Sequence, residues 1–592
     1  MNVRGSVDIP ITDKLLTKFS VSQKRADGWL ELLAESNATN TENNRNQKIP
    51  GDDNEAAVKA AILYTPNDDL SVYLTADSSY VREASAASTL LGIGKNCNDP
   101  TYEGDDDIAA EGLCEFHGVL NNLYNNSIIN PLPDVPGYGE VRYDERFIPE
   151  NPARQSYRNG PNGTDIDTFG IASIIDWSKN EEFAIKSVSS FRKVKSKLNR
   201  DADGSPLTIV HCFNDFKHEQ FSQELQISGV ALDSNLTWLA GAYYFKEKAV
   251  DNFRCQLPFN LLLRASVDNN SIATFGQASY ALTDNLTMTV GVRWTRDEKS
   301  LFPEFGAVVA FDQPETLVPN LPVVEVFDTF TDVSPKVALD YQFSDDILLY
   351  TSYSTGFKSG GFSSRTLVKR DEVLRFRPEE LETFEIGAKS EFFERRLRIN
   401  TAAFVSQYDD IQGNVIEGIA PGTQNIGDSR IRGVELEITA LATDNLLLNA
   451  SVGYLHNEYT RLATLSKGVA KDGYILATDK LTNSPTWSLV GSVEYTIPMQ
   501  SLDGDLVLRG DYSHYSEIYN DDLNSELLKQ DPYGLFNAQF AYYPYGADWT
   551  LTLWAKNIND KEYIVSGDDN IYAGFREANF GTPRTYGLTM RV

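Results

Sequence analysis

The most regular feature of the chain is an alternation of apolar and polar side chains that recurs along nearly its whole length. In the last ten residues, Tyr586, Leu588, Met590 and Val592 share one face, and small, polar or charged residues occupy the other. Because successive side chains of a strand point to opposite faces, the pattern predicts strands with one apolar face. A soluble β-sandwich also contains such strands, but their recurrence favours a membrane barrel.

Short polar turns divide this pattern into pairs of strands. Asp-Asn and Asp-Asp pairs within them suit tight turns. The ten turns are expected at residues 10–13, 67–69, 178–182, 233–235, 283–285, 344–346, 394–396, 443–445, 499–504 and 545–548.

Much longer connections alternate with the short turns. They are expected at residues 30–55, 81–168, 199–220, 246–270, 296–326, 355–379, 407–430, 455–484, 516–534 and 558–582. Short periplasmic turns on one rim and long extracellular loops on the other are typical of bacterial outer-membrane barrels. The sequence therefore predicts an all-β fold, a transmembrane antiparallel β-barrel with about 21 strands present. Because such barrels have an even strand number, we expect the 22-strand type, with one strand missing before Met1. This is the strand number of outer-membrane transporters whose lumen is plugged.

Composition narrows the class of protein. The mean hydropathy of −0.34 and the lack of an 18-residue apolar run argue against transmembrane helices. Aromatic residues make up 11% of the chain, as expected for the aromatic girdles of a barrel. The net charge of −31 argues against nucleic acid as a partner. The first ten residues contain no apolar export signal.

Four cysteines fall in the expected outer loops, where an oxidising environment favours disulfides. The economical pairing joins Cys97 to Cys114 and Cys212 to Cys255, although four cysteines allow three pairings. No CxxC or close Cys/His pair supports a metal site.

The histidines give no support for catalysis. The sequence has no HExxH pair and no GxSxG, Walker or GxGxxG motif in a suitable context, so we expect neither enzyme activity nor a cofactor. His211, beside Cys212, is expected to lie on a loop surface.

Several segments resemble the TonB-dependent receptor family, in particular the iron-complex outer-membrane type. They are residues 3–15, 334–362, 377–392, 430–440 and 579–592. The run from Tyr353 through Phe357, Lys358 and Phe362 is the most specific. The resemblance spans residues 1–592 as one barrel domain, without the signal peptide, TonB box, plug and first strand of the family. The chain also ends in Val592, where the family usually has an aromatic residue.

The resemblance implies a location in the bacterial outer membrane and TonB-dependent uptake of a scarce ligand, such as a ferric siderophore or similar iron complex. The implied partners are that iron chelate, TonB through the missing plug segment, outer-membrane lipid and lipopolysaccharide, and the barrel-assembly machinery through the C-terminal strand. Two alternatives remain: a passive, porin-like or inactive barrel fragment, and a secreted soluble β-protein that binds glycans.

The loop after Tyr353 is the candidate ligand site. Its aromatic and cationic side chains could hold an anionic, planar ferric chelate by stacking and charge. The candidate residues are Tyr353, Phe357, Lys358, Phe362 and Arg365. The competing interpretation is structural: Gly356, Gly360 and Gly361 allow a packed loop to turn, and the basic groups contact lipopolysaccharide or a plug.

Overall fold

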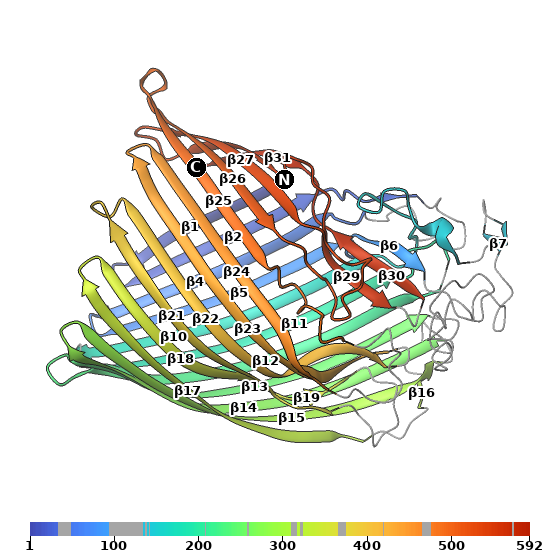
Figure 1. The fold of residues 1–592 in the computed structure, drawn as a ribbon, viewed down its shortest axis with the longest axis horizontal. Coiled ribbons are helices and arrows are strands. Elements are labelled where there is room, and N and C mark those ends of the chain that lie inside the picture. Colours follow the sequence, from blue (N-terminus) through green and yellow to red (C-terminus); the bar gives the residue numbers. More distant parts are fainter. Residues whose placement is uncertain are drawn as a thin grey trace.

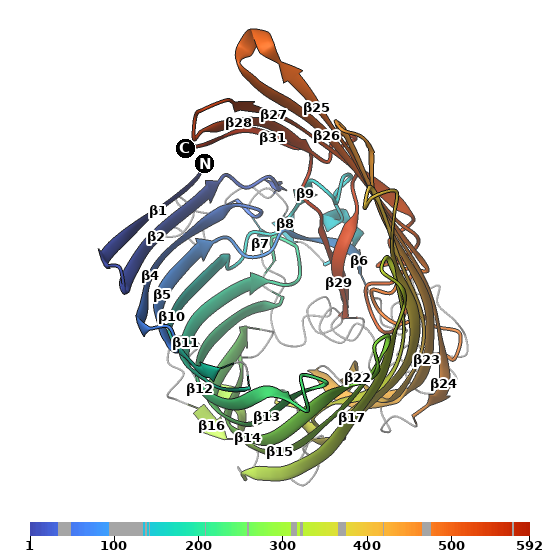
Figure 2. The same cartoon turned by 90° about the vertical axis from the view of Figure 1, so that its left-hand side faces the viewer.

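A wall of antiparallel strands encloses a lumen in the computed structural model (Figures 1 and 2). The structure describes residues 1–33, 49–93, 134–135, 139–140, 143–180, 182–207, 209–256, 260–308, 317–319, 324–364, 375–417, 420–463, 475–570 and 574–592. Within these ranges the main sheet has 22 strands, and one of them, β16 (Leu317–Pro319), pairs only with the end of β15. The remaining 21 strands of the described chain form the wall, as the turn count predicts.

The wall strands follow one another around the barrel in chain order. They are β1 (Asn2–Thr12), β2 (Leu15–Ala26), β4 (Asp53–Asn67), β5 (Leu70–Glu83), β10 (Gly163–Asn180), β11 (Phe183–Asp201), β12 (His211–Ala231), β13 (Leu236–Gln256), β14 (Asn260–Thr283), β15 (Leu286–Val308), β17 (Val326–Ser344), β18 (Ile347–Lys358), β21 (Glu379–Phe392), β22 (Leu397–Glu417), β23 (Ala420–Thr443), β24 (Leu446–Leu462), β25 (Trp487–Met499), β26 (Gly504–Tyr515), β27 (Tyr533–Pro544), β28 (Thr550–Lys556) and β31 (Thr585–Arg591).

Smaller elements lie in the connections between wall strands. They are β3 (Glu31–Leu32), β6 (Ser88–Ile93), β7 (Asp134–Val135), β8 (Gly139–Glu140), β9 (Gln155–Ser156), β19 (Gly361–Phe362), β20 (Arg375–Phe376), β29 (Ile564–Asn570), β30 (Phe575–Phe580) and the 3₁₀ helices η3 (Glu145–Phe147) and η7 (Gln500–Leu502). Over the described ranges, no helix has the length and apolar character needed to span a membrane.

The predicted alternation places apolar side chains on the outer face of the wall. On β15, Val290, Val292 and Trp294 are exposed on one face. On the other face, the Arg293 guanidinium lies over the rings of Tyr243 and Phe275. The face with exposed apolar side chains suits lipid and the charged face suits a hydrated lumen, which contradicts the alternative of a secreted soluble β-protein.

The ten predicted short turns are confirmed. Each connects two neighbouring wall strands that pair in antiparallel register. They all lie at one end of the barrel, and the long connections lie at the other (Figure 1).

Several expected loop boundaries are wrong. Residues 246–256 and 260–270, predicted as loop, are strand and belong to β13 and β14, and β22 and β23 likewise continue into the expected loop 407–430. The segment Lys246–Gln256 has polar and apolar side chains on both faces, so it lacks the one-sided apolar signal of a lipid-facing strand. Backbone pairing nevertheless continues through it.

The two end strands of the wall are unpaired on one side. In the described residues β1 pairs with β2 alone, and β31 pairs with β28 alone. Successive wall strands alternate in direction, so the first and the twenty-first run the same way. The two edges, which lie near each other in Figure 2, therefore cannot join by the antiparallel pairing used elsewhere in the wall.

The long connections form a small hydrophobic core of their own, which we call the outer lobe. Its buried residues come from segments far apart in sequence: Leu90, Tyr143, Phe147, Ala202, Leu207, Ile209, Val210, Cys212, Cys255, Leu261, Leu263 and Phe575. Because these side chains pack together, the lobe holds the long connections in place at the outer end of the barrel.

A charge on the outer face should destabilise the barrel strongly. Val292 lies between Met288 and Trp294 on the apolar face of β15, whereas Gln277 lies on the opposite face of the adjacent strand. We expect Val292→Arg to lower the free energy of unfolding in lipid vesicles by about 2–4 kcal/mol. Gln277→Arg, the matched control, should change it by less than about 1 kcal/mol. Equal losses in urea titrations would contradict the assignment of faces.

Candidate functional site

A polar cavity of about 590 Å³ lies among the long connections, and we call it the acidic cavity. Its walls come from the end of β11, from β19, β20, β22, β23 and β29, and from the connection between β26 and β27. The lining side chains include Arg200, Phe362, Ser363, Phe376, Asn414, Thr423, Thr482, Asn520, Asp521, Asp522, Asp568 and Asp569. The cavity thus combines two aromatic rings with hydroxyl, amide and carboxylate groups.

Negative charge dominates the acidic cavity. Four aspartates and one arginine are found among its described lining residues. Arg200 forms ion pairs with Asp568, at 3.4 Å, and with the buried Glu577. Asp569 accepts from Nε of Arg576, at 3.0 Å. These pairs leave Asp521 and Asp522 as the carboxylates that give the cavity its excess negative charge.

Asp521 and Asp522 are held by the surrounding chain. The Asp522 carboxylate accepts from Oγ1 of Thr482 at 2.5 Å and from the backbone N–H of Asn414 at 3.1 Å. Asp521 accepts from the N–H of Ser525 through one oxygen, and its other oxygen is buried without a hydrogen-bond partner. Burial raises the pKa of Asp521 to about 6, although the Ser525 N–H opposes this shift.

The structure separates the residues that the sequence groups as a ligand site. Tyr353 lies opposite Val337 and Phe384 on the outer, lipid-side face of β18, and Phe357 shares that face by alternation. Lys358 forms an ion pair with Glu379 at 3.4 Å. Phe362 alone of the five is placed by the structure in the lining of the acidic cavity, and Arg365 lies outside the described residues.

The glycines of this segment allow close packing. A Cβ at Gly360 would lie 2.5 Å from the ring of Phe330 and from the carbonyl oxygen of Phe376. A Cβ at Gly361 would lie 2.8 Å from the Phe376 ring. Small residues are therefore needed here because β19 and β20 pack against aromatic rings, and this packing places Phe362 at the cavity.

Of the two cysteine pairs expected from the sequence, the structure joins Cys212 and Cys255 by a disulfide bond between β12 and β13. Both residues belong to the outer lobe. Cys97 and Cys114 lie outside the described residues. The neighbouring His211 was expected on a loop surface, but it is buried in the outer lobe, only 7% exposed.

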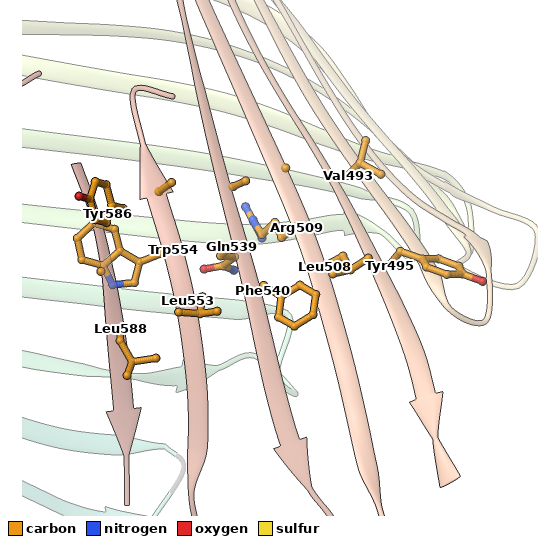
Figure 3. Close-up of a pocket in the computed structure, with 14 residues that line it drawn as sticks. Val493, Tyr495, Leu508, Arg509, Gln539, Phe540, Leu553, Trp554, Tyr586 and Leu588 are labelled. Atoms are coloured by element: carbon orange, nitrogen blue, oxygen red, sulfur yellow. The ribbon is translucent and has the colours of Figure 1, made fainter. Parts of the chain in front are cut away.

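An apolar groove of about 890 Å³ crosses β25–β28 and β31 on the outside of the wall (Figure 3). Small residues form its floor, and exposed apolar side chains such as Val493, Phe540 and Leu588 stand around it. The opposite face of the same strands carries the ion pair between Arg509 and Glu494. The groove therefore faces lipid, and a water-soluble ligand would not enter it.

The residues of the cavity could not be grouped from sequence because Arg200 lies more than three hundred residues before Asp521 in the chain. The doublets Asp521-Asp522 and Asp568-Asp569 are visible in the sequence. Such doublets are also common on exposed loops. Without the fold, they do not indicate where a binding site lies.

A transmembrane barrel with an ordered outer lobe and a polar cavity at its long-loop end defines the class of outer-membrane receptor barrels. The family model described as "TonB dependent receptor-like, beta-barrel" matches residues 116–558. The chain belongs to this family, which comprises transport receptors rather than enzymes.

Curated relatives match in part. The probable TonB-dependent siderophore receptor PiuA of Acinetobacter baumannii is 26% identical over 326 residues, covering 54% of this chain and 41% of that protein. The metal-pseudopaline receptor CntO of Pseudomonas aeruginosa is 23% identical over 265 residues, covering 44% of this chain and 33% of that protein. The chain thus spans less than half the length of these relatives.

A solved structure supports the fold. The ferric yersiniabactin uptake receptor FyuA of Yersinia pestis superposes with a TM-score of 0.74 and 15% identity. The superposition covers 100% of this chain and 77% of FyuA. At this identity the likeness shows the barrel architecture.

The stability of the outer loops should depend on the charge of Asp521. Its folded-state pKa is raised from 3.8 to about 6, so folding favours the protonated form. Its stabilising contribution is present below pH 4 and is lost as the pH rises through 6. We therefore expect Asp521→Asn to be more stable than wild type at pH 7.5, by at most about 3 kcal/mol, and no more stable at pH 4.

Thermal unfolding at the two pH values measures this difference. Asp346→Asn, in an exposed short turn, is the control and should show no pH-dependent difference from wild type. The same offset for Asp521→Asn at both pH values would contradict the assigned pKa.

Proposed function

We propose that the protein captures a metal chelate in the acidic cavity, as the first step of TonB-dependent uptake across the outer membrane. The position and lining of the cavity support this proposal. The cavity lies at the long-loop end of a barrel of the TonB-dependent receptor family, and side chains from several loops line it. A ligand in the cavity would contact β19, β23, β29 and the β26–β27 connection at the same time. Binding could therefore affect several segments at the outer end of the barrel.

The class of ligand follows from the names of the relatives and from the charge of the cavity. The relatives are described as siderophore, metal-pseudopaline and ferric yersiniabactin receptors, which supports an iron complex or a similar metal chelate. The excess carboxylates favour a chelate with amine or hydroxyl groups on its outer surface. A strongly anionic chelate would be repelled by the ionised carboxylates of the cavity.

Phe362 and Phe376 supply the apolar part of the site. Their rings line the cavity beside Asp522 and Thr423. Aromatic rings beside polar groups allow a chelate to stack and to form hydrogen bonds at the same time. The lumenal wall, the plug segment and TonB would then complete the uptake pathway.

The proposal is tested by uptake of ⁵⁵Fe-labelled chelates into iron-limited cells that produce the protein in its natural full-length form. Phe362→Ala and Asp522→Asn should each raise the half-saturating chelate concentration by about tenfold or more. Phe343→Ala, at an exposed short turn, and Asp346→Asn are the matched controls and should leave it unchanged.

Collapse of the inner-membrane proton gradient separates active uptake from a passive pore. Energy-coupled uptake should stop, while chelate binding to the cell surface persists. Uptake that continues without the gradient would overturn the energy-coupled function in favour of the porin-like alternative. Uptake that is insensitive to both cavity variants would overturn the cavity as the site.

A further inference from the structure

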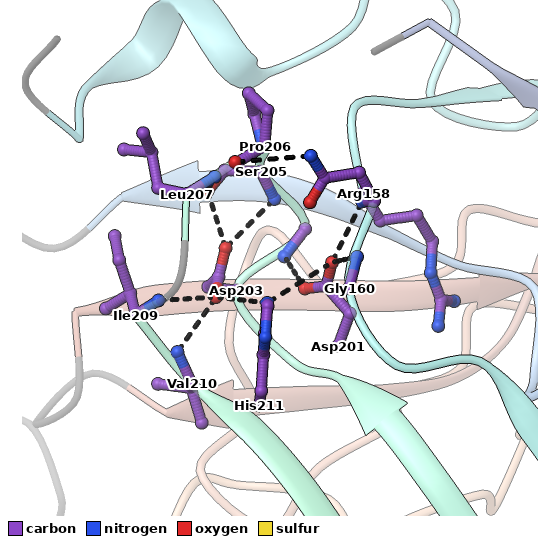
Figure 4. A network of polar contacts seen from close by, with 12 residues as sticks. Arg158, Gly160, Asp201, Asp203, Ser205, Pro206, Leu207, Ile209, Val210 and His211 are labelled. Atoms are coloured by element: carbon purple, nitrogen blue, oxygen red, sulfur yellow. Dashed lines mark hydrogen bonds and ion pairs between the residues drawn. The ribbon is translucent and has the colours of Figure 1, made fainter. Parts of the chain in front are cut away.

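The outer lobe contains a buried polar cluster that chelate uptake does not use (Figure 4). Asp201 ends β11, His211 begins β12, and Asp203 lies in the connection between them. Both aspartates are completely buried, and His211 is 7% exposed. Nε2 of His211 lies 3.9 Å from an oxygen of each carboxylate. Three potential metal ligands therefore converge inside a lobe that the wall strands and the disulfide already hold.

Backbone amides fix the orientation of the two carboxylates. The N–H groups of Asn159 and Gly160 donate to Oδ2 of Asp201, at 3.1 and 2.8 Å. Those of Ile209 and Val210 donate to Oδ2 of Asp203, at 3.1 and 2.8 Å. Donors of this kind orient the ligands of metal sites, since they prevent the carboxylates from turning away.

His211 presents an unsatisfied nitrogen to these carboxylates. A distance of 3.9 Å is too long for a hydrogen bond, and in the described part of the chain Nε2 has no hydrogen-bond partner. A neutral imidazole has a lone pair on one ring nitrogen, and Nε2 can direct it toward the carboxylates. A cation between Nε2 and the carboxylates would satisfy this buried nitrogen.

The charged groups around the cluster are two carboxyls and one guanidinium. The buried Arg158 directs its guanidinium to the carbonyl of Ala86 and the hydroxyls of Ser85 and Ser88. A divalent cation would offset the charge that two ionised carboxylates bring into this buried site.

Gly160 keeps the space beside the histidine open. A Cβ at this position would lie 2.4 Å from Nε2 of His211. Any larger residue would therefore fill the space that faces this nitrogen. Gly160 has no side chain and so supplies no side-chain ligand to the ion.

We propose that Asp201, Asp203 and His211 bind one divalent transition-metal ion, of which Zn²⁺ suits the donor set. Imidazole with two carboxylates favours Zn²⁺ over Mg²⁺ or Ca²⁺, which take oxygen ligands. The candidate ligand atoms all lie within 4.8 Å of one another, and the ligand atoms of a tetrahedral Zn²⁺ lie about 3.4 Å apart, so binding would draw the three side chains closer together. Asp201 accepts three hydrogen bonds and keeps a free lone pair, and Asp203 joins by releasing the longer bond from Ile209.

The ion would have a structural role, because it would cross-link segments of the outer lobe. It joins the end of β11 to the start of β12 one residue before the disulfide at Cys212, and the amide contacts link it to Asn159 and Gly160. Binding should therefore raise the thermal stability of the lobe, independently of any chelate in the acidic cavity.

The test uses the whole chain in detergent micelles, dialysed against a chelator and titrated with Zn²⁺ by calorimetry and thermal unfolding. We expect one Zn²⁺ per chain and a rise in the unfolding temperature. His211→Gln should weaken binding at least about tenfold, and Gly160→Ala should do the same while keeping all three ligands. His456→Gln, which removes an exposed histidine of β24, is the matched control and should bind as wild type does.

X-ray absorption at the zinc edge of the wild-type protein keeps the proposal testable if a variant does not fold. The expected first shell contains nitrogen and oxygen at about 2.0–2.2 Å with one imidazole and no sulfur. No stoichiometric binding, a sulfur shell, or binding that His211→Gln leaves intact would each overturn the site, the last showing an adventitious ion only. Chelate uptake by the wild-type and His456→Gln proteins is measured in a separate experiment. A negative result in the zinc-binding test therefore does not contradict the proposal of chelate uptake.

Discussion

The fold depends on one constraint, which is that every backbone N–H and C=O group inside a bilayer must find a partner within the protein. The antiparallel ladder from β1 to β31 meets it, and the pairing of β12 with β13, for example, runs from His211 to Ala231 without a register shift. Alternation of side chains then follows from the pleat: Val292 faces lipid because Arg293 faces the lumen. The unpaired edges of β1 and β31 are the one place where the wall does not satisfy this constraint within the described chain.

The same ladder explains the outer lobe. Strands β12 to β15 continue past the membrane as paired ribbons, and the connections pack an apolar core against them. Pairing makes this region stiff, so side chains from distant segments can be held at fixed positions. The acidic cavity and the Asp201–His211 cluster both depend on that stiffness, since each combines residues of the connections with residues at the ends of wall strands.

Sequence reasoning succeeded where a single physical signal repeats. The ten turns and the 21 wall strands could be predicted because each strand carries its own alternation and each turn is a short polar segment, most of them with Asp or Asn. It failed where the signal is missing. Lys246–Gln256 has polar and apolar side chains on both faces and was predicted as a loop, although it is strand. Tyr353 and Phe362 are close in sequence, yet one lies on the outer face and the other at the cavity. His211 looked like loop surface because residues that lie against it, Gly160 and Asp201 among them, are not adjacent to it in the chain.

The central claim is that one face of the wall contacts lipid and the other encloses a lumen. Fluorescence of single-tryptophan proteins in vesicles of brominated lipid tests it directly. Trp294 lies on the outer face of β15, whereas Trp554 points to the other face of its strand and donates to Oγ1 of Thr589 at 3.0 Å. The protein that retains only Trp294 should be strongly quenched, and the protein that retains only Trp554 should not. Equal quenching of both, or quenching of Trp554 alone, would contradict the barrel orientation.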